Sequence, residues 1–357
     1  MAAIHVTKTF LPPQTRYGEI LARAWDAGWI TNRGALVKEL ETTLKSYLGV
    51  EYLIATTNGT LPLQIAIKAL GLQGEIITTP FSYVATTSSI YWEQCTPVFV
   101  DIEPEYFTID PAKIEASITP STSAILATHV FGNPCDVDAI EAIATKHNLK
   151  VIYDAAHCFG VQYKGKSILN YGDVSTLSFH ATKLFHTGEG GAMICNNQTL
   201  NDCLFYHHNF GHRGKEEFQC LGINAKMSEL QAAMGLAVLD YIAGNIQKRA
   251  AHVEAYRFKL EGVKSIKIRP ETEWNSAYFP ILFKDSKSLS AAVDALNKED
   301  IFPRRYFYPS LETLPYVNSN HCHVANKIAS TVLCLPLYES LTPQELERIC
   351  NIVNSHA

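Results

Sequence analysis

A carboxylate and a lysine 29 positions apart could together perform cofactor chemistry in this chain. Asp154 follows the β-branched and aromatic run 151–153, which predicts a buried strand with the carboxylate at its C-terminal end. Lys183 follows a second apolar run, 174–179, and precedes the glycine-rich turn 188–191. Ligands of open α/β sheets bind beyond the carboxyl ends of the strands. Because pyridoxal phosphate takes a lysine Schiff base for its aldehyde and an acidic partner for its pyridinium nitrogen, the pair predicts this cofactor.

Each of the two residues also has an ordinary structural alternative. A buried carboxylate needs a partner, and Asp154 could cap the following segment instead of pairing with the pyridinium nitrogen. Most lysines are exposed, but Lys183 stands beside the apolar pair Leu184-Phe185. An apolar setting lowers the pKa of an amine, which favours covalent chemistry. His157, shortly after Asp154, is predicted to lie against the cofactor ring or its phenolic oxygen.

The cofactor phosphate is predicted to bind where a strand gives way to a helix at Asn58-Gly59-Thr60. Free backbone N–H groups and the helix dipole make such a point a natural anion site, with the Thr60 and Ser178 hydroxyls as further donors. The alternative is a purely structural helix cap. Tyr83, also just past a strand, is predicted to stack on the pyridine ring, although an aromatic there could equally be ordinary packing.

Short apolar runs alternate with helical patterns between about residues 34 and 242, which predicts a mostly parallel sheet. An amphipathic helix is predicted between Gly34 and Gly49. Further helices are predicted over 61–70 and from Ser228, which fits a capping box with Gln231. The seven predicted strands are 52–56, 75–78, 97–100, 124–128, 151–153, 174–179 and 192–195.

The pattern changes after residue 245. A helix over 245–260, an alternating run over 278–283, a helix over 289–298 and a last helix from Thr342 predict a smaller α+β domain. The chain is therefore expected to have an α/β fold in two parts. Residues 1–245 would form a large cofactor-binding domain around the seven-stranded, mostly parallel sheet, and residues 246–357 a small C-terminal domain.

Composition argues against several other classes of protein. The net charge is −5 and the basic residues are scattered, which argues against nucleic-acid binding. No run approaches the roughly 20 apolar residues of a membrane span, and the start lacks the apolar core of a secretory signal. Nine cysteines without a C-x-x-C pair indicate free thiols in the cytoplasm. Nothing completes a ligand set around His321-Cys322-His323, so we expect no metal site.

Motifs spread over nearly the whole chain resemble those of the DegT/DnrJ/EryC1/StrS family of sugar aminotransferases. This family belongs to fold-type I of the pyridoxal phosphate enzymes. Besides the segments around Asp154 and Lys183, the matching motifs are Thr31-Asn32-x-Gly34, Asn58-Gly59-Thr60, 97–102, 109–111, 131–134, 222–229 and 335–337. One departure is Lys226, where many members have arginine.

The resemblance implies roles for individual residues. Lys183 would hold the cofactor covalently and shuttle a proton, Asp154 would pair with the ring nitrogen, and His157 would lie near the ring. Asn224 would reach the phosphate of the neighbouring subunit's cofactor, because the family builds its sites across a dimer interface. The other implied cofactor contacts are Tyr83 on the ring face, and Gly59, Thr60 and Ser178 on the phosphate.

The resemblance also implies a reaction, the transfer of an amino group from L-glutamate to a keto group of a nucleotide-linked sugar. The opening segments and 179–185 look like the branch that acts on dTDP-4-keto-6-deoxy-D-glucose for surface polysaccharide. Amination at position 3 and GDP- or UDP-linked sugars remain alternative substrates. A dehydratase and a non-catalytic regulator remain alternative functions. The related dehydratases have histidine at the position of Lys183, so the lysine argues against a dehydratase. Segment 304–309 is expected to shape the sugar-nucleotide pocket, with Arg304 or Arg305 meeting the diphosphate.

Overall fold

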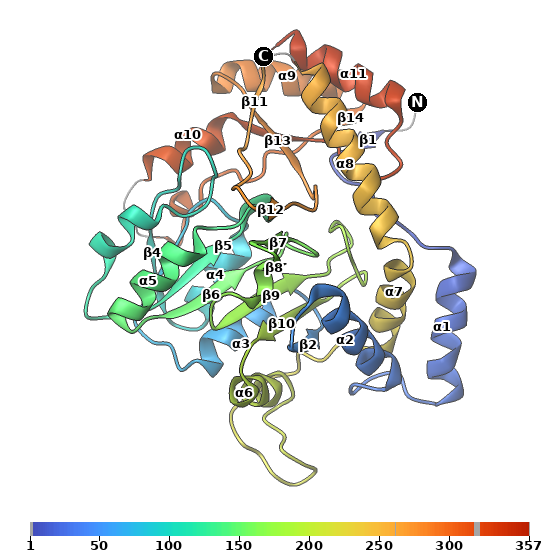
Figure 1. Ribbon diagram of the computed structural model, residues 1–357, viewed down its shortest axis with the longest axis vertical. Helices are drawn as coiled ribbons and strands as arrows, with labels where there is room; N and C mark the ends of the chain where they lie inside the picture. The colour runs from blue at the N-terminus through green and yellow to red at the C-terminus, as the bar shows by residue number, and fades with distance from the viewer. Residues whose placement is uncertain (1–2, 261, 318–321, 357) are drawn as a thin grey trace.

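A seven-stranded sheet forms the centre of the computed structural model, which describes residues 3–260, 262–317 and 322–356 (Figure 1). The strand β10 is antiparallel to both of its neighbours, and the remaining pairs are parallel. In spatial order the strands are β2 (Tyr52–Thr56), β10 (Gly191–Cys195), β9 (Val174–Ser178), β6 (Lys150–Asp154), β5 (Thr122–Thr128), β3 (Glu75–Thr78) and β4 (Thr96–Phe99). All seven predicted strands are present, each end within two residues, and the predicted fold class is confirmed.

Every strand of this sheet except β4 buries side chains on both faces. In β5, Ala124 and Leu126 pack into one apolar cluster, while Ile125 and Ala127 pack into another. Successive side chains of a strand point to opposite faces, so a sheet covered by helices on both sides needs continuous apolar runs. One face is covered by α1 (Gln14–Asp26), α2 (Ala35–Leu48), α5 (Val137–His147) and α7 (Glu229–Leu239), and the other by α3 (Leu61–Ala69), α4 (Val84–Trp92) and α6 (Gln198–His208).

The predicted helix signals mark real helix ends. The helix α2 ends at Gly49, whose φ of 64° lies in the left-handed region that glycine adopts without a steric penalty. The helix α7 begins after Ser228, and the predicted capping box with Gln231 is present in full. The helices α2 and α7 contact each other beside the sheet edge that carries β10 and β2 (Figure 1).

The C-terminal part forms a second, smaller cluster of buried side chains. The predicted alternating run corresponds to β13 (Phe279–Leu282), which pairs antiparallel with β11 (Lys264–Ser265) and β15 (Val332–Leu335). The N-terminal strand β1 (Ile4–His5) joins this part by pairing with β14 (Ile301–Phe302). Its helices are α8 (Ile242–Lys259), α9 (Ser286–Lys298), α10 (His323–Thr331) and α11 (Pro343–Asn354).

The predicted boundary between the two domains, at residue 245, remains a proposal. This position lies inside α8, whose second half contributes Val253 and Tyr256 to the smaller cluster. A three-stranded sheet that the sequence did not predict connects the two parts, because β12 (Thr272–Glu273) pairs with β7 (Gln162–Tyr163), which also pairs with β8 (Lys166–Ser167). Among the described residues, no helix is long and apolar enough to cross a membrane.

Candidate active site

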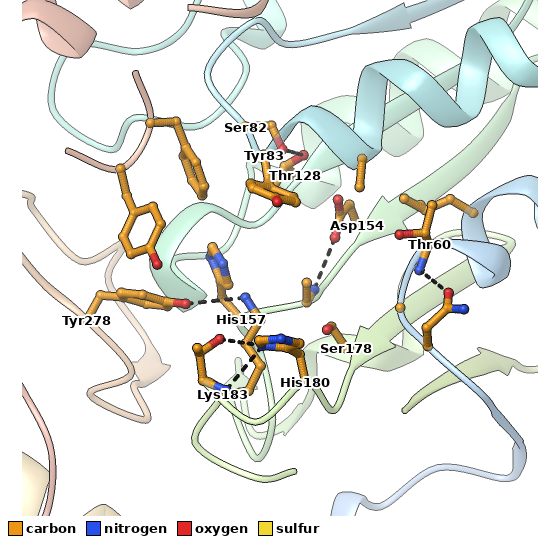
Figure 2. A pocket seen from close by; sticks show the side chains of 18 of the residues that line it. Thr60, Ser82, Tyr83, Thr128, Asp154, His157, Ser178, His180, Lys183 and Tyr278 are labelled. Carbon is orange, nitrogen blue, oxygen red and sulfur yellow. Dashed lines mark hydrogen bonds between the residues drawn. The ribbon is translucent and has the colours of Figure 1, made fainter. Parts of the chain in front are cut away.

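A cavity of about 420 Å³ lies at the carboxyl ends of the parallel strands (Figure 2). Asp154 ends β6, Thr128 ends β5 and Ser178 ends β9, so three strands deliver side chains to one place. This is where open α/β sheets bind ligands. Seven of the eight predicted site residues line the cavity: Gly59, Thr60, Tyr83, Asp154, His157, Ser178 and Lys183.

Asp154 is a buried carboxylate whose hydrogen bonds are satisfied by its surroundings. Oδ2 accepts a hydrogen bond from the Thr86 hydroxyl at 2.7 Å, and Oδ1 accepts one from the Ala156 amide at 3.2 Å. Thr86 in turn shares a hydrogen bond with Ser82, which shares another with Thr128. Burial raises the pKa of Asp154, while the Thr86 and Ala156 hydrogen bonds and the Lys183 charge oppose that rise. The carboxylate is thus fixed at the cavity floor.

His157 is a buried and neutral imidazole. Its Nδ1 accepts a hydrogen bond from the Phe131 amide at 3.0 Å, so the proton of the neutral ring is on Nε2. Burial lowers its pKa well below the usual value, and the nearby Lys183 charge lowers it further. The ring is parallel to that of Phe307, with centroids 5.7 Å apart. His157 therefore presents a flat, uncharged surface to the cavity.

Lys183 extends into the cavity from the turn after β9. Its amide donates to the His180 carbonyl at 2.8 Å, and its Nζ donates to the Tyr278 hydroxyl at 3.3 Å. Burial lowers the pKa of the amine; Tyr306, Asp154 and Tyr83 partly offset this. The apolar setting that the sequence predicted is present, since both Leu184 and Phe185 are buried.

The phosphate end of the predicted site differs in one detail from the expectation. Asn58 Oδ1 accepts hydrogen bonds from the amides of Thr60 and Leu61, at 2.9 and 3.0 Å, so these N–H groups are already capped. The hydroxyls of Thr60 and Ser178 line the cavity without a hydrogen-bond partner in the described part of the chain. Glycine is required at 59, because a Cβ there would lie 2.6 Å from the Ser178 Cβ.

Two further predictions concern the cavity rim. Tyr83 is the residue before α4, lines the cavity and is 57% exposed. Of the two arginines considered for the diphosphate, Arg304 lines the cavity. Arg305 instead donates to the Ala329 carbonyl at 3.1 Å. The aromatic side chains of Tyr306 and Phe307 also line the cavity.

Asn224, the eighth predicted residue, lies outside the cavity. It is exposed on the segment between α6 and α7, and its Oδ1 accepts a hydrogen bond from Lys226 Nζ at 2.7 Å. Within one chain it therefore contributes nothing to the cavity wall.

Several cavity residues could not be predicted from the sequence. The hydroxyls of Ser82, Thr86 and Thr128 support Asp154 from positions up to 72 residues earlier in the chain, and such positions carry no local signal. Tyr278 begins the predicted alternating run, and alternation assigns a residue to one face of a strand, not to a site. Among the described residues, which exclude His321, no group of three or more side chains could hold a metal ion.

These residues fit pyridoxal phosphate on structural grounds. A buried carboxylate, a lysine with a lowered pKa, a flat neutral ring and two unpaired hydroxyls beside a glycine surround one cavity. They match, in turn, the needs of a pyridinium nitrogen, an aldehyde, a planar ring and a phosphate. When bound, this cofactor supplies an electron sink for the carbon that gains or loses the amino group.

Comparisons with known proteins agree with the chemistry of the cavity. The DegT/DnrJ/EryC1/StrS aminotransferase family matches residues 15–354. The chain is 43% identical to a dTDP-4-amino-4,6-dideoxy-D-glucose transaminase of Shigella dysenteriae and 40% identical to one of Escherichia coli, each over 98% of both chains. The crystal structure of DesI with its TDP-sugar product superposes with a TM-score of 0.94 at 32% identity, covering 99% of this chain and 93% of DesI. Enzymes of this family depend on pyridoxal phosphate, so the predicted cofactor and enzyme class are confirmed. The chain belongs to the DegT/DnrJ/EryC1/StrS aminotransferase family.

Proposed function

We propose that this protein transfers the amino group of L-glutamate to the keto group of dTDP-4-keto-6-deoxy-D-glucose, giving dTDP-4-amino-4,6-dideoxy-D-glucose. The observation that carries the proposal is the meeting of Lys183 and Asp154 in one cavity of a chain that is 40–43% identical to two transaminases named for this product. GDP-perosamine synthases are 30–32% identical to it, and an aminotransferase for a UDP-linked 3-oxo sugar is 33% identical. The higher identity favours the dTDP-linked 4-keto sugar over these alternatives.

Each cavity residue has a role in this proposal. Lys183 Nζ would hold the cofactor covalently and, when released, would carry the proton that leaves the amino-bearing carbon of the donor. Asp154 would pair with the ring nitrogen, and His157 and Tyr83 would lie against the ring. The Gly59 segment and the hydroxyls of Thr60 and Ser178 would hold the phosphate.

Arg304 is proposed to bind the diphosphate of the sugar nucleotide. Its guanidinium lies 5.3 Å from the centre of the Tyr306 ring, at the rim of the same cavity. A guanidinium binds phosphate oxygens through two parallel hydrogen bonds, and stacking on an aromatic ring restricts its orientation. A diphosphate held at this rim would leave the hexose extending toward Lys183.

A second copy of the chain is proposed to complete the site. The segment between α6 and α7 projects from the body of the fold (Figure 1). It exposes four large apolar side chains, Phe210, Phe218, Leu221 and Ile223. Exposed apolar clusters of this kind favour association. Asn224 lies on the same segment, and because Lys226 donates to its Oδ1, its Nδ2 is free to donate to a phosphate of the partner's site.

The shared site predicts that Asn224→Asp weakens cofactor binding about tenfold or more, because it places a negative charge beside a phosphate. The affinity would be measured by equilibrium dialysis of pyridoxal phosphate, with sedimentation velocity to confirm the same assembly state. Asn197→Asp is the matched control, since Asn197 caps α6 and aspartate caps equally well. Equal affinity in the two variants would contradict the shared site.

We also propose that the enzyme works in the cytoplasm and supplies surface polysaccharide. All nine cysteines are free, as in a reducing compartment. A sugar activated by a nucleotide and bearing a new amino group is a donor for a glycosyltransferase, which fits polysaccharide assembly.

The reaction is tested by visible absorption of the purified, cofactor-loaded protein. L-Glutamate should shift the band of the lysine-linked cofactor to shorter wavelength, and dTDP-4-keto-6-deoxy-D-glucose should restore it. A response to glutamate followed by recovery only with a 3-keto or a GDP- or UDP-linked sugar would keep the enzyme class and overturn the substrate. No response to glutamate would overturn the proposed amino donor.

A further inference from the structure

A short segment of the C-terminal part, 274–278, is fastened to the loops around the cavity. Trp274 Nε1 donates to the Phe131 carbonyl at 2.8 Å. Asn275 Nδ2 donates to the carbonyls of His157 and Phe159, at 2.8 and 3.0 Å. These are the same loops that hold the His157 ring, so this segment and the cavity wall share one set of contacts.

A buried arginine also binds the same segment. Arg249 of α8 is 4% exposed, and its Nη1 donates to the Ala277 carbonyl at 3.2 Å. The Ala277 amide donates to Asn275 Oδ1 at 3.1 Å, which closes a tight turn before Tyr278. Hydrogen bonds to α8 and to the loop after β6 therefore fix the backbone that precedes Tyr278.

The consequence is a fixed hydroxyl beside the lysine amine (Figure 2). Tyr278 is buried, its ring centre lies 4.7 Å from that of His157, and its hydroxyl accepts from Lys183 Nζ at 3.3 Å. This is the single hydrogen bond of that amine within the described residues. Neither Asp154 nor any other carboxylate in the described ranges forms an ion pair with it.

We propose that Tyr278 is a positioning residue, whose hydroxyl holds the amine of Lys183 whenever that amine is free. The inference rests on the proposed role of Lys183 and adds to it. An unheld lysine side chain has several rotatable bonds and would spend most of its time away from the reacting atoms. The Tyr278 phenol, whose backbone is fixed by Trp274, Asn275 and Arg249, restricts the position of the Lys183 amine.

The hydroxyl suits both protonation states of the amine. Burial raises the pKa of Tyr278 above its usual value, so it remains a phenol and can accept from an ammonium or donate to a neutral amine. The other titratable groups that face Lys183 are Asp154, His157, Tyr83 and Tyr306, and His180 lies on its own turn. Hydrogen bonds to a charged group are roughly twice as strong as neutral ones, so the bond to the ammonium contributes more.

Tyr278→Phe therefore should lower the pKa of the Lys183 amine by about one pH unit, because the buried ammonium loses its hydrogen bond while burial still opposes its charge. The measurement is competitive labelling of the full-length, cofactor-free protein with acetic anhydride across a pH series, read by mass spectrometry of the Lys183 peptide. Tyr256→Phe is the matched control, since it also removes a buried hydroxyl, which donates to the Pro336 carbonyl at 2.8 Å in the smaller cluster.

A second measurement follows the cofactor-loaded enzyme. Tyr278→Phe should lower kcat about tenfold and displace its pH profile to lower pH, with KM for the sugar nucleotide little changed. An unchanged Lys183 pKa in Tyr278→Phe would overturn the inference, and so would equal shifts in Tyr278→Phe and the control variant. Labelling needs no substrate, so a wrong choice of sugar would affect only the kinetic measurement.

Discussion

Lys183→Ala is expected to reduce amino transfer by at least about 10³-fold, the largest loss for any single substitution in this chain. Under the proposed roles of Lys183, the variant would lose both the covalent attachment of the cofactor and the group that carries the proton, because one nitrogen performs both. No other lysine is among the described residues that line the cavity, so no neighbouring amine is placed to substitute for Lys183. The measurement is single-turnover conversion of the sugar nucleotide, followed by chromatography of the product.

Two comparisons separate loss of chemistry from loss of structure. Lys287→Ala changes an exposed lysine at the start of α9 and should leave turnover unaltered. Circular dichroism and thermal unfolding of Lys183→Ala should match the wild type, since removing a buried amine with a lowered pKa removes no favourable charge. Near-normal single-turnover rates in Lys183→Ala would mean that the cavity is not the active site.

The large sheet could be predicted because each of its strands is a local pattern. Buried strands of a parallel sheet are apolar on both faces, so the runs 75–78 and 151–153 were recognisable without any knowledge of their neighbours. Strand order and direction were not available from these runs. The antiparallel direction of β10 depends on the course of the chain after Lys183, which places the glycine-rich turn 188–191 next to the phosphate end.

Residues of the cavity were predictable from the sequence where they lie at or shortly after a strand end. Asp154, Ser178 and Lys183 satisfy that condition, and the structure brings all three to one cavity. The supporting groups were not predictable, because they reach the cavity by tertiary contacts across long separations, as Thr86 reaches Asp154 and Tyr278 reaches Lys183. The two-residue strands β7, β8 and β12 were missed for the same reason, since their pairing and not their composition defines them.

Asp154→Asn is expected to reduce amino transfer by at least about 10²-fold while leaving the fold intact, because it removes one buried negative charge without changing the shape of the side chain. The amide can still accept from the Ala156 amide, and its NH₂ group can donate to Thr86, whose hydroxyl then donates onward to Ser82. The measurement is the rate of the glutamate half-reaction, observed in the visible band. Full rates in this variant would remove the proposed stabilisation of the ring nitrogen.

The same substitution predicts a gain in stability for the cofactor-free protein, and its sign follows from the pKa. Burial raises the pKa of Asp154 in the folded state, so the unfolded state loses its proton more readily, and the wild type loses stability as pH rises from the unfolded to the folded pKa. Asparagine does not ionise, so cofactor-free Asp154→Asn should unfold at a higher temperature than the wild type at pH 8, with the difference shrinking at low pH. Thr86→Val is the matched comparison, because it removes the Thr86 hydrogen bond but leaves the carboxylate and should lower stability. A lower unfolding temperature for Asp154→Asn at pH 8 would contradict the prediction and show that the carboxylate stabilises the fold. A gain in stability together with a loss of rate would mean that this charge serves catalysis and destabilises the fold.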